Sequence, residues 1–348
     1  MKNIDNYIGP SADFEPLTYD KYRNSRSLNA LDLLKFIMAL GVMVIHVNPL
    51  YTINPFLNSV FVFGFGRLAV PFFFVSSAWL LFRNGYKADV LRSVKRLLIM
   101  YIIWTIIYLP TLMADDSANM LILSLRNIIF GGHLWYLISS ACALLIILGM
   151  QRLRMKPKII FAVAFLPFTI GILLSGYNEI LNMVGLKSVS ERYFDYFISV
   201  RNGLFFGVPY MAAGLILSVN NKTYKKRSAI TALAVLYVMH LIEFVIVRKL
   251  DLTYTTDMTM IAMPFTILLV YVVVHINLKD RKIYKILRNS SILIYLIHPY
   301  VIMLYDKIVQ FDNSIIKYIL VCCLSMMFSM MILKLEQYKY FKMLKYLH

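Results

Sequence analysis

The amino-acid sequence predicts an all-α polytopic membrane protein with about ten transmembrane helices and with both its N-terminus and its C-terminus in the cytoplasm. The 348-residue chain is 60% hydrophobic and 16% charged, whereas soluble domains are roughly 45–50% apolar and about 25% charged. Several apolar runs reach the about 20 residues that a helix needs to cross a bilayer. The basic residues gather between alternate runs, which is typical of a fixed orientation in the membrane.

Ten apolar segments are candidates for the spans. In order, they lie near residues 28–48, 57–82, 96–113, 133–150, 159–176, 198–218, 229–247, 258–277, 290–309 and 314–333. The first and second carry ionisable residues inside their apolar runs, the third follows a basic cluster, and the fourth, fifth and eighth contain no Asp, Glu, Lys or Arg. The sixth, seventh and tenth contain one such residue each, and the ninth holds a His-Pro pair. The fourth is the least sharply defined, because NMLILSLRNIIFGG before it can also form an amphipathic helix on the membrane surface.

The distribution of Lys and Arg predicts the orientation. The segments before the first span and after each even-numbered span, together with Arg96 at the first position of the third span, hold 26 of the 36 Lys and Arg residues, while the first alternate loop, NPLYTINPF, holds none. Positive charge stays on the cytoplasmic side, so the number of spans is even. The formal net charge of +18 is therefore explained by orientation and by anionic lipid of the inner leaflet, and it does not indicate nucleic acid.

We expect three parts in the chain: a cytoplasmic segment 1–27, a ten-helix membrane domain 28–333 and a cytoplasmic tail 334–348. The first apolar run is too long and too interrupted for a signal peptide, so it should stay in the mature protein. The three cysteines lie inside apolar segments without the spacing of a disulfide framework or a metal site. No nucleotide-binding or hydrolase motif is present, and neither a metal site nor a further soluble domain is predicted.

The first span carries three ionisable residues, Asp32, Lys35 and His46. The eleven positions from Lys35 to His46 amount to three turns plus roughly 20°, so both side chains leave the same helix face, about 16 Å apart. This spacing predicts one wall of a passage across the membrane, in which the imidazole shares a continuous tunnel with the basic groups. Alternatively, Asp32 and Lys35 form a pair near the interface and His46 is an interfacial hydrogen-bonding residue.

Two other ionisable residues lie in the middle of spans, where an unpaired charge is costly. Arg67 needs an anionic partner, which is either a protein acid such as Asp32 or a phosphate of a ligand. His298 precedes Pro299, which loosens the backbone pairing of its helix. It is either a packed core histidine or a site residue.

Further candidates lie toward the outer ends of the spans. GGHLWYL places His133 and Trp135 at the start of the fourth span, where an aromatic belt is the favoured interpretation of Trp135, ahead of stacking on a sugar. Arg201 opens the sixth span. Glu243 lies in the outer half of the seventh, where it either neutralises Arg201 or takes part in proton transfer.

Four stretches in the expected order resemble the acyltransferase-3 family of integral membrane acyltransferases. LDLLKFIMALGVMVIH resembles the first-helix signature, a basic residue and a histidine separated by ten residues, with lysine where arginine is commoner. GRLAVPFFFVSSAWLL resembles the second-helix pattern, and HLWYL and IYLIHPYV resemble later landmarks. The resemblance covers about residues 26 to 335, and ten spans with both ends in the cytoplasm match the family core.

The resemblance implies a function and a site. Family members move an acyl group, often acetyl, from cytoplasmic acyl-CoA to a hydroxyl of an extracytoplasmic or lipid-linked carbohydrate. It implies that His46 is catalytic, that Lys35 and Arg67 contact the phosphates of the donor, and that His298 is a supporting residue. Asp32, His133, Trp135, Arg201 and Glu243 are further candidates. No bound cofactor is expected, since acyl-CoA is a substrate, and the expected location is the bacterial plasma membrane.

A transport function is the alternative. The membrane half of vancomycin-resistance serine racemases shares these signatures and is associated with supplying serine. A passage lined by Lys35 and His46 suits both functions. The absence of a racemase domain after the tenth span and the basic pair on the cytoplasmic side are the two features that favour the enzyme.

Overall fold

The computed structural model describes residues 28–85, 89–112, 132–197, 199–220, 224–252, 255–309 and 313–348. Within these ranges the protein is all α-helical, and no β-strand is present. The predicted segment 1–27 and nearly all of NMLILSLRNIIFGG lie outside the described residues.

A helix occupies every one of the ten predicted segments. The helices are α2 (Asn29–Val47), α3 (Pro55–Phe61), η1 (Val62–Gly66), α4 (Arg67–Phe82), α5 (Val90–Leu112), η2 (Gly132–Leu134), α7 (Trp135–Arg152), α8 (Pro157–Leu174), α9 (Asn178–Met183), α10 (Lys187–Tyr196), η3 (Gly203–Gly207), α11 (Val208–Val219), α12 (Lys226–Lys249), α13 (Ala262–Val274), α14 (Lys282–Ile308), α15 (Ser314–Leu335) and η4 (Lys339–Leu347). Helices α3, η1 and α4 form one continuous rod over Pro55–Phe82.

Seven of the helical segments in the described ranges are long and apolar enough to cross a membrane. They are Asn29–Val47, Pro55–Phe82, Gly132–Arg152, Pro157–Leu174, Lys226–Lys249, Lys282–Ile308 and Ser314–Leu335. Gly203–Val219 and Ala262–Val274 are shorter apolar helices, and α5 runs for 23 residues without being one of the seven. The class of a polytopic helical membrane protein is therefore shown, whereas the count of ten spans and their orientation stay predictions.

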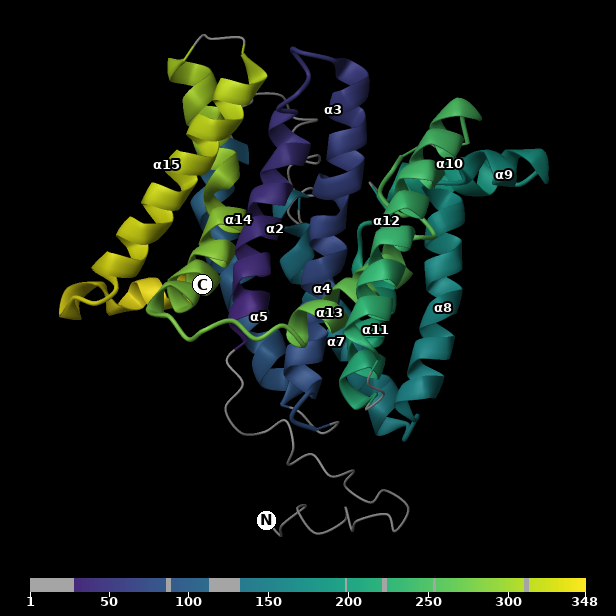
Figure 1. Ribbon diagram of the computed structural model, residues 1–348, viewed down its shortest axis with the longest axis horizontal. Coiled ribbons are helices and arrows are strands. Elements are labelled where there is room, and N and C mark those ends of the chain that lie inside the picture. The colour runs from purple at the N-terminus through teal and green to yellow at the C-terminus, as the bar shows by residue number, and fades with distance from the viewer. Residues whose placement is uncertain are drawn as a thin grey trace.

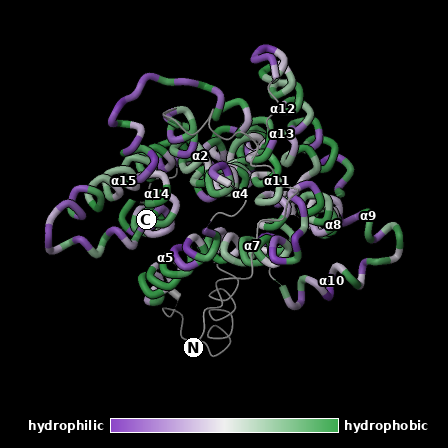
Figure 2. Tube along the Cα trace, turned by 90° about the horizontal axis from the view of Figure 1, so that it is seen from below, coloured by the Kyte–Doolittle hydropathy of each residue, from purple (hydrophilic) through white to green (hydrophobic). Residues whose placement is uncertain are grey.

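Helices α2 and α4 lie in the middle of the bundle, and the other long helices surround them (Figures 1 and 2). Helix α14 packs against α2, and α11 packs against α4. The α4–α11 contact depends on Gly214, since a Cβ there would lie 2.3 Å from the carbonyl oxygen of Val75. Hydrophobic residues dominate the helices, as Figure 2 shows, which is expected where lipid covers the outside of the bundle.

Two non-helical segments lead into short helices, and of these the residues 199–202 and 258–260 lie inside spans that were predicted as helical. Residues 199–202 precede η3, and residues 255–260 precede α13, whose N-cap is Ile261. Non-helical backbone inside a membrane protein is tolerated where it lines a cavity and its polar groups are satisfied. These two segments are therefore candidates for the walls of a site.

Glu243 of α12 accepts hydrogen bonds from the backbone at the start of α13. Its carboxylate accepts hydrogen bonds from the backbone N–H groups of Met260 (2.6 Å) and Ile261 (3.0 Å) and from the hydroxyl of Tyr177 (2.5 Å). The residue is buried, at 8% exposure. Glu243 thus fixes the segment 255–261 in place, because a carboxylate at a helix N-terminus pairs otherwise orphaned donors.

We expect Glu243→Gln to lower the thermal unfolding temperature. A glutamine amide offers one acceptor oxygen in place of two, so one buried donor is left unpaired at a cost of about 1–3 kcal/mol. Thermal unfolding of the purified protein, followed by intrinsic fluorescence, measures the change. Glu191→Gln is the control, because Glu191 is exposed and pairs with the exposed Lys187 of the same helix, α10. Equal unfolding temperatures for the two variants would contradict the role given to Glu243.

Candidate functional site

Two short π-helical segments place the arginines of the site. The segment η1 ends at Gly66, directly before Arg67. The segment η3 begins directly after Arg201 and Asn202, and the side chain of Asn202 caps it. A Cβ at Gly66 would lie 2.8 Å from Ile45 of α2, so glycine lets the two helices approach. This close approach brings Arg67 to the end of α2 that carries His46.

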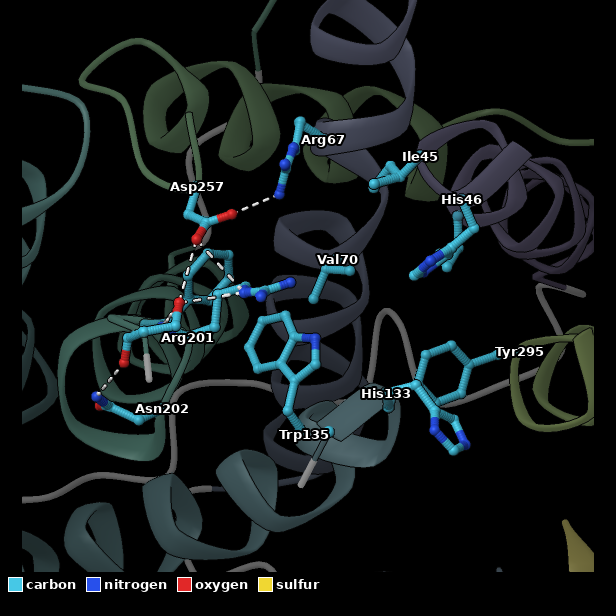
Figure 3. Close-up of a pocket in the computed structure, with 14 residues that line it drawn as sticks. Ile45, His46, Arg67, Val70, His133, Trp135, Arg201, Asn202, Asp257 and Tyr295 are labelled. Carbon is cyan, nitrogen blue, oxygen red and sulfur yellow. Dashed lines mark hydrogen bonds and ion pairs between the residues drawn. The ribbon is translucent and has the colours of Figure 1, made fainter. Parts of the chain in front are cut away.

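A cavity of about 300 Å³ lies between these elements (Figure 3). Its lining residues come from α2, α4, the η2–α7 junction, the two non-helical segments, η3 and α14. They are Val42, Ile45, His46, Arg67, Val70, Gly132, His133, Trp135, Ser199, Arg201, Asn202, Phe206, Asp257 and Tyr295. We call this the His46 cavity. It brings five of the predicted site residues together, although they are far apart in the sequence.

His46 is exposed to the cavity from the last turn of α2. Its ring lies 5.0 Å, between centroids, from the ring of His298 on α14. The Nδ1 of His298 donates to the carbonyl oxygen of Tyr295 at 2.7 Å, so neutral His298 carries its proton on Nδ1. Its buried Nε2 has no hydrogen-bond partner in the described part of the chain. An unpaired acceptor thus lies beside His46, deeper in the bundle.

Asp257 links the two arginines of the cavity. Its carboxylate is paired with Arg67 through Nη1 and with Arg201 through Nε at 3.4 Å, and it accepts a hydrogen bond from the Ser199 hydroxyl at 3.1 Å. The carboxylate is almost completely buried, with 5% of its side chain exposed. Burial acts to raise the pKa of Asp257, but the guanidinium groups of Arg67 and Arg201 outweigh it and hold the pKa below its ordinary value. Asp257 is therefore ionised at neutral pH.

Trp135 and His133 form the opposite wall. Trp135 is buried and packs edge-on against Phe206, and the guanidinium of Arg201 lies 5.8 Å from the centre of its ring. The aromatic-belt interpretation of Trp135 is therefore wrong, because the ring faces the interior of the bundle and not the lipid. His133 lies beside Tyr108, and its buried Nε2 has no hydrogen-bond partner among the described residues.

A second cavity of about 490 Å³ surrounds Lys35. Its lining includes Arg96 of α5 and Arg288 of α14, so three cationic side chains face one space. We call this the Lys35 cavity. Tyr295 lines both cavities, and its hydroxyl is anchored by a hydrogen bond to the carbonyl oxygen of His133 at 2.7 Å. In place of the continuous tunnel that was predicted, the two ends of one face of α2 line two separate cavities that have Tyr295 as a common lining residue.

The structure separates several residues that the sequence grouped. Arg67 lines the His46 cavity rather than the Lys35 cavity, and its partner is Asp257 rather than Asp32. The carboxylate of Asp32 lies 3.8 Å from Arg288; it also attracts the ammonium of Lys35, although the described residues show no direct contact between the two within 4 Å. Glu243 does not line either cavity. Its partners are the backbone N–H groups of Met260 and Ile261, the Tyr177 hydroxyl and His240. The prediction that Glu243 neutralises Arg201 is therefore wrong.

Sequence reasoning missed Asp257 and Tyr295. Asp257 lies in TTDMTM at the outer end of the eighth predicted span, where an acid is easily taken for an interfacial residue. The signal available was that Arg67 needed an acid and that few acids lie near the apolar runs. Tyr295 had no signal of its own in a chain with 24 tyrosines. In the described residues, no group of three His, Cys, Asp or Glu side chains could hold a metal ion.

The chain belongs to the acyltransferase domain family, whose sequence profile matches residues 28–334. This is the acyltransferase-3 family that the four motifs resemble. The chain is also similar to two amino-acid racemases of Enterococcus faecalis, with 23% identity over 331 residues and 25% identity over 327 residues. A serine/alanine racemase of Enterococcus gallinarum is 22% identical over 334 residues.

These matches cover 88–90% of this chain but only 45–47% of each relative. The chain thus spans less than half the length of the curated relatives it matches. No solved structure matches the chain.

Proposed function

We propose that this protein transfers an acyl group, acetyl being the simplest, from acyl-CoA to a hydroxyl of a cell-envelope or extracellular carbohydrate. The observation that carries the proposal is the arrangement of α2, whose Lys35 and His46 open into two cavities that share Tyr295. A phosphate-rich donor suits the cavity with three cationic side chains. A proton-accepting imidazole suits the cavity in which an acceptor hydroxyl is deprotonated.

In the proposed reaction, acyl-CoA binds with its phosphates near Lys35, Arg96 and Arg288. Its slender thiol arm extends past Tyr295, and the thioester carbonyl lies beside His46. The imidazole of His46 takes the proton of the acceptor hydroxyl as the oxygen attacks the carbonyl carbon. The carbon–sulfur bond then breaks, and the CoA thiolate takes the proton from the imidazolium. Alternatively, His46 carries the acyl group transiently between the two substrates.

We expect Lys35→Gln to raise the KM for acetyl-CoA by about tenfold or more and to leave kcat nearly unchanged. A hydrogen bond to a charged group is worth about 1.5–3 kcal/mol, and a phosphate contact remote from the thioester acts on ground state and transition state alike. Steady-state kinetics with acetyl-CoA as the varied substrate measure both constants. Lys95→Gln is the matched control, because Lys95 is an exposed lysine next to Arg96 that does not line the cavity. A lower kcat at unchanged KM would contradict donor binding by Lys35.

Supply of a small molecule such as serine is the second candidate function. The observation that favours it is the similarity to proteins named amino-acid racemase and serine/alanine racemase over nearly this whole chain. The two cavities, which have Tyr295 as a common lining residue, suit a passage as well as a reaction site.

Ligand stabilisation separates the two candidates. The acyltransferase proposal predicts that acetyl-CoA raises the unfolding temperature of the purified protein, since a ligand that binds only the folded state stabilises it. Lys35→Gln should weaken this effect, and free serine should have none. Stabilisation by serine without stabilisation by acetyl-CoA would favour the supply function and overturn acyl transfer.

A further inference from the structure

The charged groups of the His46 cavity do not balance. Two arginines, Arg67 and Arg201, and one acid, Asp257, line it. With the histidines neutral, the cavity carries one positive charge in excess. A charge in a cavity between apolar helices is stabilised by a partner of opposite sign. Arg201, whose side chain is 38% exposed, is accessible to such a partner, so the imbalance points to a ligand of opposite charge.

Asp257 has no capacity left to neutralise both arginines. One oxygen accepts from Nη1 of Arg67, and the other accepts from the Ser199 hydroxyl and lies 3.4 Å from Nε of Arg201. The Nε of Arg67 is buried and has no partner among the described residues. The two terminal nitrogens of Arg201 make no hydrogen bond or ion pair with any residue in the described part of the chain.

Arg201 is held in a fixed position all the same. Its Nε donates to the hydroxyl of Ser199 at 3.2 Å, and its own backbone N–H donates to the same hydroxyl at 3.1 Å. Its guanidinium lies over the ring of Trp135. Figure 3 shows the guanidinium extending over Trp135 toward the side of the cavity where His46 lies. The planar pair of terminal N–H₂ groups is therefore pre-organised for two parallel hydrogen bonds to an anionic oxygen pair.

We propose that the His46 cavity binds a ligand with a carboxylate or phosphate group, which the terminal nitrogens of Arg201 hold beside Trp135. The inference rests on the proposed acyl transfer and deepens it, because it names the class of acceptor: an anionic polyol or sugar. The chemistry fits a uronic acid and a polyol phosphate equally well. The anionic group anchors the acceptor at Arg201 while one of its hydroxyls reaches His46.

Protection of His46 against diethyl pyrocarbonate tests this directly, because His46 is exposed to the same cavity. The purified protein is treated with the reagent, and modification of the His46 peptide is followed by mass spectrometry. Glucuronate and glycerol 3-phosphate are the anionic probes, and methyl glucoside and glycerol are the matched neutral probes. We expect an anionic probe at ten times its Kd to slow modification about tenfold, and the neutral probes to have no effect. Which anion protects identifies a carboxylate or a phosphate as the group bound.

Two variants of Arg201 test whether this residue accounts for the protection of His46. Arg201→Gln should abolish protection, and Arg201→Lys, which keeps the charge without the planar fork, should retain part of it. Arg83→Gln is the matched control, because Arg83 lies over Trp79 at 5.7 Å in the same way but lines neither cavity. Its protection should equal that of the wild type.

The inference is overturned if neither anion protects His46, or if protection is the same in Arg201→Gln as in Arg83→Gln. Hydrolysis of acetyl-CoA in the absence of an acceptor is measured on the same preparations. Hydrolysis of acetyl-CoA without protection of His46 by either anion would contradict the proposed anionic acceptor, but it would agree with the proposed acyl transfer. Protection of His46 by an anion without any reaction of acetyl-CoA would instead contradict the proposed acyl transfer.

Discussion

The variant His46→Ala is expected to lose acyl transfer, with kcat/KM lower by at least about a hundredfold, which is the lower limit for removing a general base. His46 is exposed to the cavity in which Arg67, Trp135 and Arg201 also meet. The loss should lie in kcat, because the imidazole moves a proton in the transition state and binds neither substrate tightly in the ground state. Transfer of a radiolabelled acetyl group in membranes measures it.

The control for His46 is His275→Ala. His275 lies at the end of α13, bonds to the carbonyl oxygen of Tyr271 and lines neither cavity. The His275→Ala variant should have the same kcat as the wild-type protein. If His46→Ala transferred the acetyl group as fast as His275→Ala, the mechanism proposed for His46 would be removed. A substitution of His298 is harder to interpret, since His298 is buried and its ring packs against the ring of His46.

Asp257→Asn should give the second large effect, a loss of both stability and activity. The substitution leaves two guanidinium groups in the cavity without their carboxylate. We expect a cost of about 3 kcal/mol, at the low end for breaking a buried ion pair, because both guanidiniums are partly exposed to the cavity. Thermal unfolding measures the stability. Asp306→Asn is the control, since the exposed pair of Asp306 with Lys317 should contribute at most about 1 kcal/mol.

The pH dependence of this effect follows from the pKa of Asp257. Because that pKa is below its ordinary value, the carboxylate contributes stability that is complete above the pKa of the unfolded state and is lost as pH falls through the pKa of the folded state. The difference in unfolding temperature between wild type and Asp257→Asn should therefore stay constant from about pH 5 to pH 8. This difference in unfolding temperature should become smaller only at more acid pH. A difference that shrinks near neutral pH would show that Asp257 is not held ionised by Arg67 and Arg201.

Much of the fold could be predicted from the sequence because the relevant physics is local. Long apolar runs must be helical in lipid, where backbone groups have no other partner, and a helix does lie in each predicted segment. The face shared by Lys35 and His46 followed from helix geometry alone. The lengths of α11 and α13 could not be predicted, since whether an apolar segment begins as helix depends on groups elsewhere in the chain. For α13 that group is Glu243.

The assembly of the site was predicted only in part. His46, Arg67, His133, Trp135 and Arg201 do meet in one cavity, but the partner of Arg67 was not foreseen. Pairing depends on which helices touch, and hydropathy does not specify contacts between helices. The same lack of information made Trp135 look like a lipid-facing belt residue, because an aromatic residue near the end of a span has the same local sequence whether it faces lipid or protein.

The most direct test of this account follows a labelled acetyl group across the protein after reconstitution into lipid vesicles. Acetyl-CoA with a radiolabelled acetyl group is supplied on the side predicted to be cytoplasmic, and the label is traced on the other side. The account predicts that the label leaves CoA and appears on an added acceptor or as acetate with wild-type protein, and that it stays on CoA with His46→Ala. Retention of the label on CoA in both proteins, together with serine entry that depends on His46, would contradict it.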